Sequence, residues 1–233
     1  MKLLQRCARG LASFGLAGAA VAAPAGPWTD VDALVTYETR QVMASGITRT
    51  DTWQERLVRR GDQVWTERVL PGGSGVPHPG ESASEHFGHK HLNADNAAHW
   101  LSLGANGQVE LKLVDREHKL VVDIPAAEFA TVSFDGRYDA AAAVVPPAVA
   151  RAMKADAAAT AEGQWRSERN QGWTHRVLWS ETRQLALRVQ SQRDDGSVQR
   201  SVTVRLLPAS AGRSAPWQAL AGYTPTHYDE FMD

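Results

Sequence analysis

The strongest constraint on the fold is a pair of alternating runs near the end of the chain, "LALRV" (185–189) and "VTVRLL" (202–207). Successive side chains of a strand point to opposite faces, so each run has one apolar face and one polar face. The turn "DDGSV" between them is centred on Asp195–Gly196, a pair typical of tight hairpins. The pattern predicts an antiparallel hairpin with one face against a core. Its apolar members are Leu185, Leu187, Val189, Val202, Val204 and Leu206.

Further strands are indicated by β-branched and aromatic residues bounded by turn residues. The turn pairs in the first half are Ser45–Gly46 and Gly61–Asp62, and the charged turn "REHK" lies between two alternating runs. Together with the late hairpin, these runs predict seven to nine antiparallel strands. The remaining runs are "LVTYETRQVM" (34–43), "TRTDTWQERLVRR" (48–60), "QVWTERVL" (63–70), "QVELKLVD" (108–115), "LVVDIP" (120–125) and "GWTHRVLWS" (172–180).

Helices are expected in the gaps between the strands. Asn93 can cap a short helix in "ADNAAHWLSL" (94–103), and the alanine-rich stretch 125–158 reads as helical pieces broken at Pro146–Pro147. The end, "HYDEFMD", suits a short terminal helix. Because helices are grouped rather than alternating with strands, the expected class is α+β. We expect a strongly curved antiparallel β-sheet, a half-barrel, with helices packed on the concave side.

The N-terminus resembles a secretory signal. A basic start is followed by the uncharged apolar run 11–23, which ends in small residues before Pro24. The run is shorter than the roughly 20 residues that span a bilayer. We therefore expect residues 1–23 to be a signal peptide, residues 24–233 to be one domain, and the protein to reside in the periplasm with no transmembrane segment after cleavage. A buried N-terminal helix is the alternative.

Cleavage after Ala23 would remove Cys7, the only cysteine, and leave 22 basic against 26 acidic residues. A chain without thiols has no disulfide, no thiolate metal site and no cysteine nucleophile. A net negative charge gives no electrostatic case for a nucleic-acid partner.

Two stretches resemble the periplasmic lipoprotein-carrier fold of LolA and of the N-terminal domain of RseB, a regulator of an envelope-stress sigma factor. They are "VTYETRQVMASGITRTDTWQERLVRRGDQVWTERV" and "VLWSETRQLALRVQSQRDDGSVQRSVTVRLL". The first contains the turn Arg60–Gly61–Asp62, and the second places Trp179, Leu187 and Gly196 as the family does. Ala186 stands where the family usually has proline, and the histidine-rich loop at about 71–91 is foreign to the family.

The resemblance, over residues 34–207, implies a helix-covered curved sheet with an apolar concave face. It implies a non-enzymatic binding or adaptor protein whose ligand or partner is a lipid, a lipoprotein or another envelope protein. The candidate apolar pocket consists of tryptophans on predicted strands and one leucine. Filling of an ordinary core by these aromatics is the alternative. The candidate pocket residues are Trp53, Trp65, Trp173, Trp179 and Leu187.

The loop "HPGESASEHFGHKH" (78–91) holds four of the eight histidines. Imidazoles and a carboxylate at this spacing suit Zn²⁺ or Cu²⁺. A histidine here could also ligate haem, although no C-x-x-C-H motif for covalent haem attachment occurs. A polar Gly/Pro/Ser-rich loop without a metal is the other interpretation. The candidate metal ligands are His86, His89 and His91, with His78 or Glu85 in support.

No G-x-S-x-G, H-E-x-x-H, P-loop or G-x-G-x-x-G motif occurs. His175 on a strand is expected to be a core histidine, and His118 in the "DREHK" turn a solvated one. We therefore expect the protein not to be an enzyme. Two hypotheses remain open: a lipoprotein-carrier-like binding module, and a periplasmic metal- or haem-handling protein.

Overall fold

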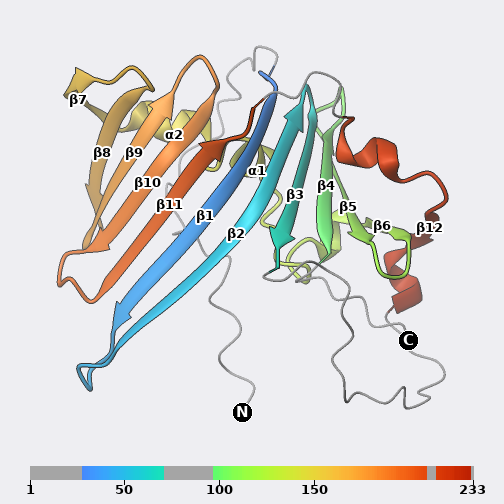
Figure 1. The fold of residues 1–233 in the computed structure, drawn as a ribbon, viewed down its shortest axis with the longest axis horizontal. Helices are drawn as coiled ribbons and strands as arrows, with labels where there is room; N and C mark the ends of the chain where they lie inside the picture. The colour runs from blue at the N-terminus through green and yellow to red at the C-terminus, as the bar shows by residue number, and fades with distance from the viewer. Residues whose placement is uncertain (1–27, 71–96, 209–213, 232–233) are drawn as a thin grey trace.

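The computed structural model describes residues 28–70, 97–208 and 214–231. These residues form one large, curved, unclosed sheet with twelve strands in the order β12-β6-β5-β4-β3-β2-β1-β11-β10-β9-β8-β7 (Figure 1). β12 pairs in parallel with β6, and every other neighbouring pair is antiparallel. The first strand therefore lies at the middle of the sheet, between β2 and β11.

The strands are β1 (Val31–Val42), β2 (Thr48–Arg60), β3 (Gln63–Val69), β4 (Ala98–Leu103), β5 (Val109–Asp115), β6 (Leu120–Ile124), β7 (Lys154–Ala159), β8 (Gln164–Asn170), β9 (Trp173–Ser180), β10 (Leu185–Arg193), β11 (Val198–Leu206) and β12 (Thr224–His227). The helices are η1 (Ala126–Glu128), α1 (Tyr138–Ala143), α2 (Pro147–Ala152), η2 (Pro216–Ala219) and η3 (Tyr228–Phe231), where η marks a 3-10 helix.

The curved sheet is confirmed, but the balance of elements differs from the expected α+β class. Strands make up 54% of the described residues, and helices are few, so the fold is dominated by its sheet. The predicted late hairpin is β10 paired antiparallel with β11, with Val189 opposite Val202. The expected terminal helix is the single 3-10 turn η3.

Two predicted helical stretches are wrong in part. Residues Ala98–Leu103 form strand β4, and Lys154–Ala159 form the edge strand β7. β4 lies between β3 and β5, which offer hydrogen-bonding groups on both sides. Its side chains also alternate between two apolar surroundings, with Leu101 on one face and Ala98 on the other. The local alanine content favours a helix, but a strand at this position forms backbone hydrogen bonds with both neighbouring strands.

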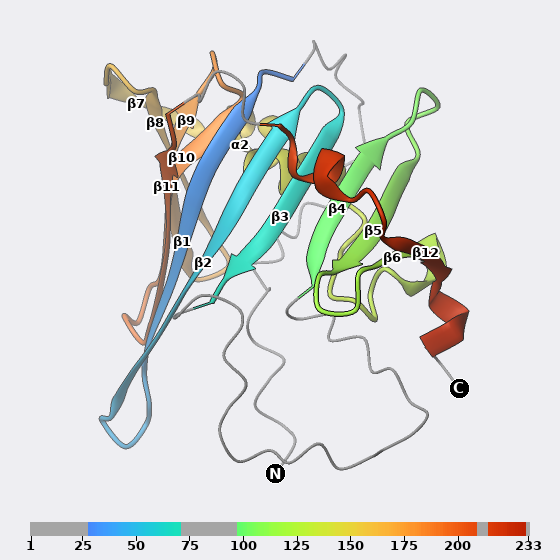
Figure 2. The ribbon, with the colours of Figure 1, turned by 45° about the vertical axis from the view of Figure 1, so that its right-hand side comes forward.

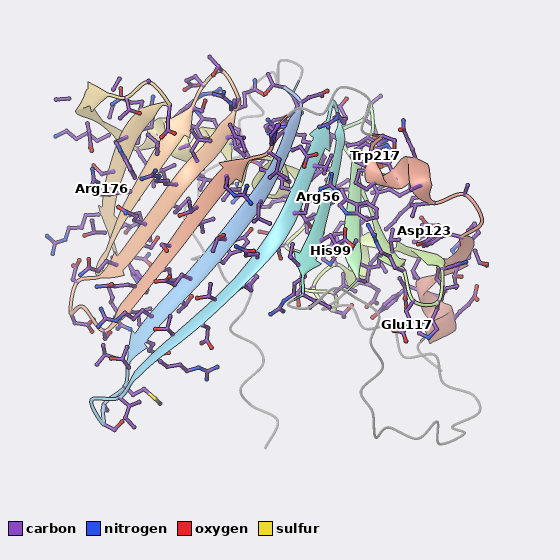
Figure 3. The ribbon with its side chains drawn as sticks, in the orientation of Figure 1. Arg56, His99, Glu117, Asp123, Arg176 and Trp217 are labelled. Carbon is purple, nitrogen blue, oxygen red and sulfur yellow. The ribbon has the colours of Figure 1, made fainter. Side chains whose placement is uncertain are left out.

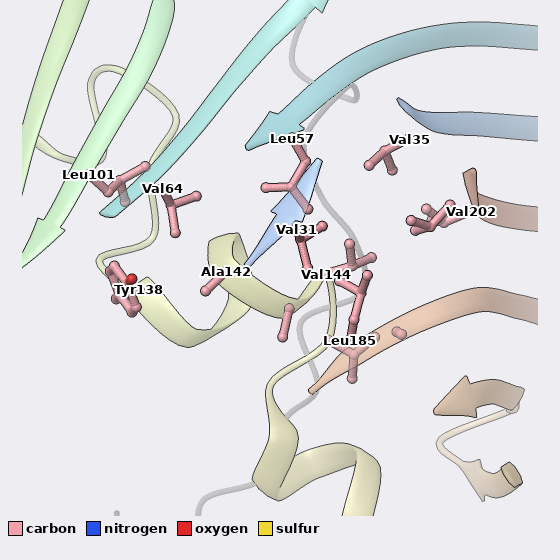
Figure 4. Packing of buried hydrophobic residues seen from close by; sticks show 14 of the residues in the cluster. Val31, Val35, Leu57, Val64, Leu101, Tyr138, Ala142, Val144, Leu185 and Val202 are labelled. Atoms are coloured by element: carbon pink, nitrogen blue, oxygen red, sulfur yellow. The ribbon is translucent and has the colours of Figure 1, made fainter. Parts of the chain in front are cut away.

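The two faces of the sheet differ, and we name them by their position. The inner face carries the large core and is covered by α1 and α2, which lie behind the sheet in Figure 1. Figure 4 shows Ala142 and Val144 of the helical segment among Val31, Leu57, Val64 and Leu185 of the sheet. The inner core therefore joins both halves of the sheet through one short helical layer.

The outer face carries a smaller second core over β2 to β6. Its buried members are Val58, Trp65, Ala98, Val114 and Val121. The C-terminal segment 214–227 lies on them, with Trp217, Leu220 and Tyr223 packed against the cluster (Figure 2). The ring of Trp217 stacks on Trp100 at 6.2 Å between centroids. Within the described parts of the chain, no helix has the length and apolar character needed to span a bilayer.

Candidate ligand-binding face

An apolar row crosses five strands of the inner face. Directly opposed residues of antiparallel strands point to the same side, so the pairing register defines the row. It runs Trp53, Tyr37, Val202, Val189 and Val177, on β2, β1, β11, β10 and β9. The three valines are buried, while Tyr37 and Trp53 are partly exposed. The row thus leads from the buried inner core to a pair of accessible aromatic rings.

The two rings at the end of this row form a flat stack. The centroids of Tyr37 and Trp53 are 4.9 Å apart, with an angle of 8° between the ring planes. Tyr37 also packs against the inner core. A partly exposed aromatic stack that continues a buried apolar surface offers contact area with little conformational entropy to lose.

A polar row runs beside the apolar one, two residues further along each strand. Its members are Asp51, Thr39, Arg200, Ser191, His175 and Glu168, on β2, β1, β11, β10, β9 and β8. The inner face therefore changes from apolar to polar within one row, so it can contact a ligand that has both characters.

His175 is the most enclosed titratable group of the polar row. It is only 5% exposed, and its Nδ1 lies 2.8 Å from the hydroxyl of Ser191. Its ring lies parallel to Trp173 at 6.0 Å, and the guanidinium of Arg200 stands 5.2 Å from the Trp173 ring centroid. Burial lowers the pKa of His175, Glu168 opposes this shift, and Arg200 adds to it. His175 is therefore held as a neutral imidazole, hydrogen-bonded to Ser191.

The helical layer over the inner face has little stability of its own. α1 and α2 contain six residues each, and neither has a side-chain hydrogen bond at its N-terminus. Val144, between them, has φ of 67°, a strained value for a β-branched residue. Such short, uncapped helices form only when tertiary contacts hold them. The position of the layer therefore depends on its contacts with the sheet.

Arg59 supplies a buried polar contact between the sheet and α1. Its side chain is fully buried on β2, and its guanidinium donates to the carbonyl oxygen of Ala142 in α1 at 2.6 Å. It also donates to the carbonyls of Thr29, Arg183 and Gln184. Burial lowers the pKa of Arg59 to about 10, so the side chain stays charged at neutral pH. One guanidinium thus joins the N-terminal segment, β2, α1 and the β9–β10 turn.

The structure places the predicted pocket residues on two different faces. Trp53 and Trp173 are partly exposed on the inner face, and Trp179 and Leu187 are buried in the inner core. Trp65 is fully buried in the outer core, on the opposite side of the sheet. Four of the five predicted residues thus share the inner side, and Trp65 does not join them.

The predicted metal ligands His78, Glu85, His86, His89 and His91 lie outside the described residues, as does the expected signal peptide 1–23. Among the residues that are described, no group of three or more His, Asp or Glu side chains could hold a metal ion. The metal and haem hypothesis for the loop therefore stays a prediction.

Sequence reasoning missed Tyr37, Arg59, Ser191 and Arg200 as members of this face. Tyr37 and Arg59 lie on predicted strands, whereas Ser191 and Arg200 lie just beyond the predicted runs 185–189 and 202–207, where β10 and β11 continue. Tyr37 could have been found by pairing the first two predicted strands, because the turn after Met43 sets it opposite Trp53. The contact of Arg59 with Ala142 has no signal in the sequence.

Comparisons with known proteins give only loose similarities of fold. No family model matches the chain, and no curated protein matches it. An uncharacterised conserved protein from Thermus thermophilus is 10% identical over 83% of this chain and 90% of its own, with a TM-score of 0.36. A domain described as an outer membrane lipoprotein-sorting protein, from Vibrio parahaemolyticus, is 10% identical over 82% and 91%, with a TM-score of 0.31.

A DUF1329 family protein from Desulfovibrio piger is 8% identical over 79% of this chain and 87% of its own, with a TM-score of 0.32. At these identities and TM-scores, no function is transferred to the chain.

Proposed function

We propose that this protein is an exported, non-enzymatic binding protein that holds an apolar ligand, such as an acyl chain, or an apolar segment of an envelope partner on its inner face. The observation that carries the proposal is the apolar row that ends in the accessible stack of Tyr37 and Trp53. An acyl chain bound at this end of the row would contact the two aromatic rings, which continue the apolar surface of the buried valines. Each methylene removed from water there contributes about 0.8 kcal/mol.

The polar row gives the ligand an orientation. Thr39 and Arg200 lie directly beside Tyr37 and Val202, two residues along their strands. A ligand with an apolar chain and a polar or anionic head would place the chain on the apolar row and the head at Arg200. Pockets for amphipathic ligands commonly combine a mainly apolar lining with a few polar groups in this way.

The helical layer supports the proposal, because its position depends on its contacts with the sheet. It covers the upper part of the inner face in the view of Figure 1, while Tyr37 and Trp53 remain partly exposed. An apolar ligand that binds beside this stack would add its apolar surface to the existing inner core. The periplasmic location rests on the sequence of residues 1–23 and is part of the same proposal.

The test is titration of the protein with a fluorescent long-chain fatty acid, comparing the wild type with Trp53→Ala. Loss of the indole removes half of the exposed stack, so we expect the dissociation constant to rise about tenfold, which equals about 1.4 kcal/mol. Trp217→Ala is the matched control, because Trp217 is also partly exposed and stacked but lies on the outer face. It should leave the affinity unchanged.

Thermal unfolding of both variants separates a loss of binding from a loss of folding. The proposal fails if the wild-type protein does not bind the fatty acid, or if Trp217→Ala weakens binding as much as Trp53→Ala does while both variants remain folded.

A further inference from the structure

Five arginines form a diagonal stripe on the outer face. The stripe is Arg56 on β2, Arg205 on β11, Arg188 on β10, Arg176 on β9 and Arg169 on β8. Figure 3 labels Arg56 and Arg176, which mark two well-separated points of the stripe. No lysine takes part, and the neighbouring positions along the same strands are mostly threonine, serine and glutamine.

The pairing register fixes the diagonal. Arg188 is opposite Thr203, two residues from Arg205, and Arg176 is opposite Gln190, two residues from Arg188. Arg169 is opposite Thr174, two residues from Arg176. Diagonal neighbours of this kind are roughly 7–8 Å apart on one face of a sheet.

Arg56 extends the line at its other end. Leu34 of β1 is opposite both Arg56 and Arg205, so these two arginines lie in one row, two strands apart. That separation is about 9–10 Å, twice the distance between neighbouring strands.

The charges along the stripe are not balanced. Arg56 pairs with Asp32 at 3.0 Å, Arg176 with Asp156 at 2.9 Å, and Arg169 with Asp194 at 2.9 Å. Arg188 and Arg205 are exposed, and the described residues give neither of them a hydrogen bond or an ion pair. Two guanidiniums therefore stand at the centre of the stripe without a carboxylate, although the whole chain has a net charge of −1.

The stripe is also ordered by its surroundings. The guanidinium of Arg176 lies over the ring of Trp165, 4.8 Å from its centroid, a favourable cation–π contact. Guanidiniums bind carboxylates through two parallel hydrogen bonds, and so are better suited than lysines to a partner of defined geometry.

We propose that this arginine stripe binds an acidic segment of a partner protein in extended conformation. Alternate side chains of an extended chain point the same way and are about 6.8 Å apart, close to the roughly 7–8 Å between diagonal neighbours from Arg205 to Arg169. Acidic residues at every second position would thus meet successive arginines. This surface is on the opposite side of the sheet from the proposed ligand-binding face, so the two proposed sites do not overlap.

A membrane surface fits this stripe less well. Proteins that lie on a bilayer insert apolar side chains between the headgroups, beside their basic residues. In the described part of the chain, the large apolar side chains that are exposed are Val42, Met43, Ile47, Val69 and Leu70. They lie at the β1–β2 turn and the end of β3, and none is a member of the stripe.

The test is fluorescence anisotropy with a labelled ten-residue peptide of alternating glutamate and serine, at low salt, against the full chain. We expect the double variant Arg188→Gln/Arg205→Gln to raise the dissociation constant at least about tenfold. Arg40→Gln is the matched control, because Arg40 is an exposed arginine of the outer face that lies off the stripe, opposite Gln199. It should change the constant less than about twofold.

Three results would overturn the proposal. The first is equal peptide binding by the wild type and the double variant. The second is equal binding of a peptide with five contiguous glutamates followed by five serines, because the spacing would then not matter. The third is binding of vesicles of anionic phospholipid that depends on Arg188 and Arg205 when the peptide does not bind, which would assign the stripe to lipid headgroups.

Discussion

The two faces of the sheet differ in the side chains they present and in what covers them. On the inner face, apolar residues from β1 to β6 and β9 to β11 meet one helical layer and form a large core. On the outer face, only β2 to β6 carry a small core, and strands β8 to β11 present arginines and hydroxyl side chains. Because strand side chains alternate, one strand serves both purposes at once.

This difference indicates where each kind of binding can occur. The inner face can extend its apolar surface to a ligand at Tyr37 and Trp53, whereas the outer face can attract charge. The same difference should appear in stability, because the inner core joins both halves of the sheet and the outer core does not. Substitutions on the two faces therefore test how far the inner core determines the stability of the molecule.

The largest effect is expected from a large-to-small change in the inner core. Trp179 is fully buried there, so Trp179→Ala should lower the free energy of unfolding by about 3–5 kcal/mol. Trp217 packs on the outer core and is partly exposed, so Trp217→Ala should cost about 1–2 kcal/mol. Urea unfolding at neutral pH measures both. Equal losses would show that the C-terminal segment matters as much as the inner core.

The next effect concerns the polar connection of the helical layer. Arg59→Met should lower the free energy of unfolding by about 3 kcal/mol, because it leaves the buried carbonyl of Ala142 and the partly buried carbonyls of Thr29 and Gln184 without their donor. Arg188→Met, at an exposed position of the outer face, should change stability by less than about 0.5 kcal/mol. Hydrogen exchange should show faster exchange in α1 of the Arg59 variant. Unchanged exchange there would mean that the hydrogen bond from Arg59 to Ala142 does not hold α1 in place.

The smallest effect is a pH dependence at His175. Burial lowers its pKa in the folded protein below the unfolded value of about 6.5. The stability that comes from its neutral form is therefore complete above about pH 6.5 and is lost as pH falls through the lower, folded pKa. His175→Gln should flatten the fall in unfolding free energy between about pH 7.5 and 5.5.

His227→Gln is the control for this prediction, because His227 is exposed and its variant should keep the wild-type slope. Urea unfolding at several pH values gives the slopes. If His175→Gln and the wild type have the same slope, burial of this imidazole does not contribute to acid sensitivity.

The sequence predicted the strands best where one face alone is buried. The alternation of 185–189 with 202–207 identified β10 and β11, and the turn at Asp195–Gly196 connects them as expected. It failed at Ala98–Leu103, where both faces are apolar and alanine favours a helix, so the periodicity carries no clear signal. β12 was missed because its four residues gain their strand form only by pairing with β6.

The candidate sites show the same division. The tryptophans were identifiable as candidates, but only the pairing register separates Trp65 on the outer face from Trp53 and Trp179 on the inner side. The arginine stripe could not be recognised in the sequence, because its members come from five strands and align only through the pairing registers of those strands.

The sequence by itself determined the alternation within each strand, and with it which residues of a strand share a face. The tertiary structure decided which strands are neighbours, where the inner core ends at Tyr37 and Trp53, and which arginines align. The physical reason is that side-chain alternation is a local property of the extended backbone. The rows across a sheet depend instead on hydrogen-bond registers between segments far apart in the chain, such as those of Ala33 and Leu206.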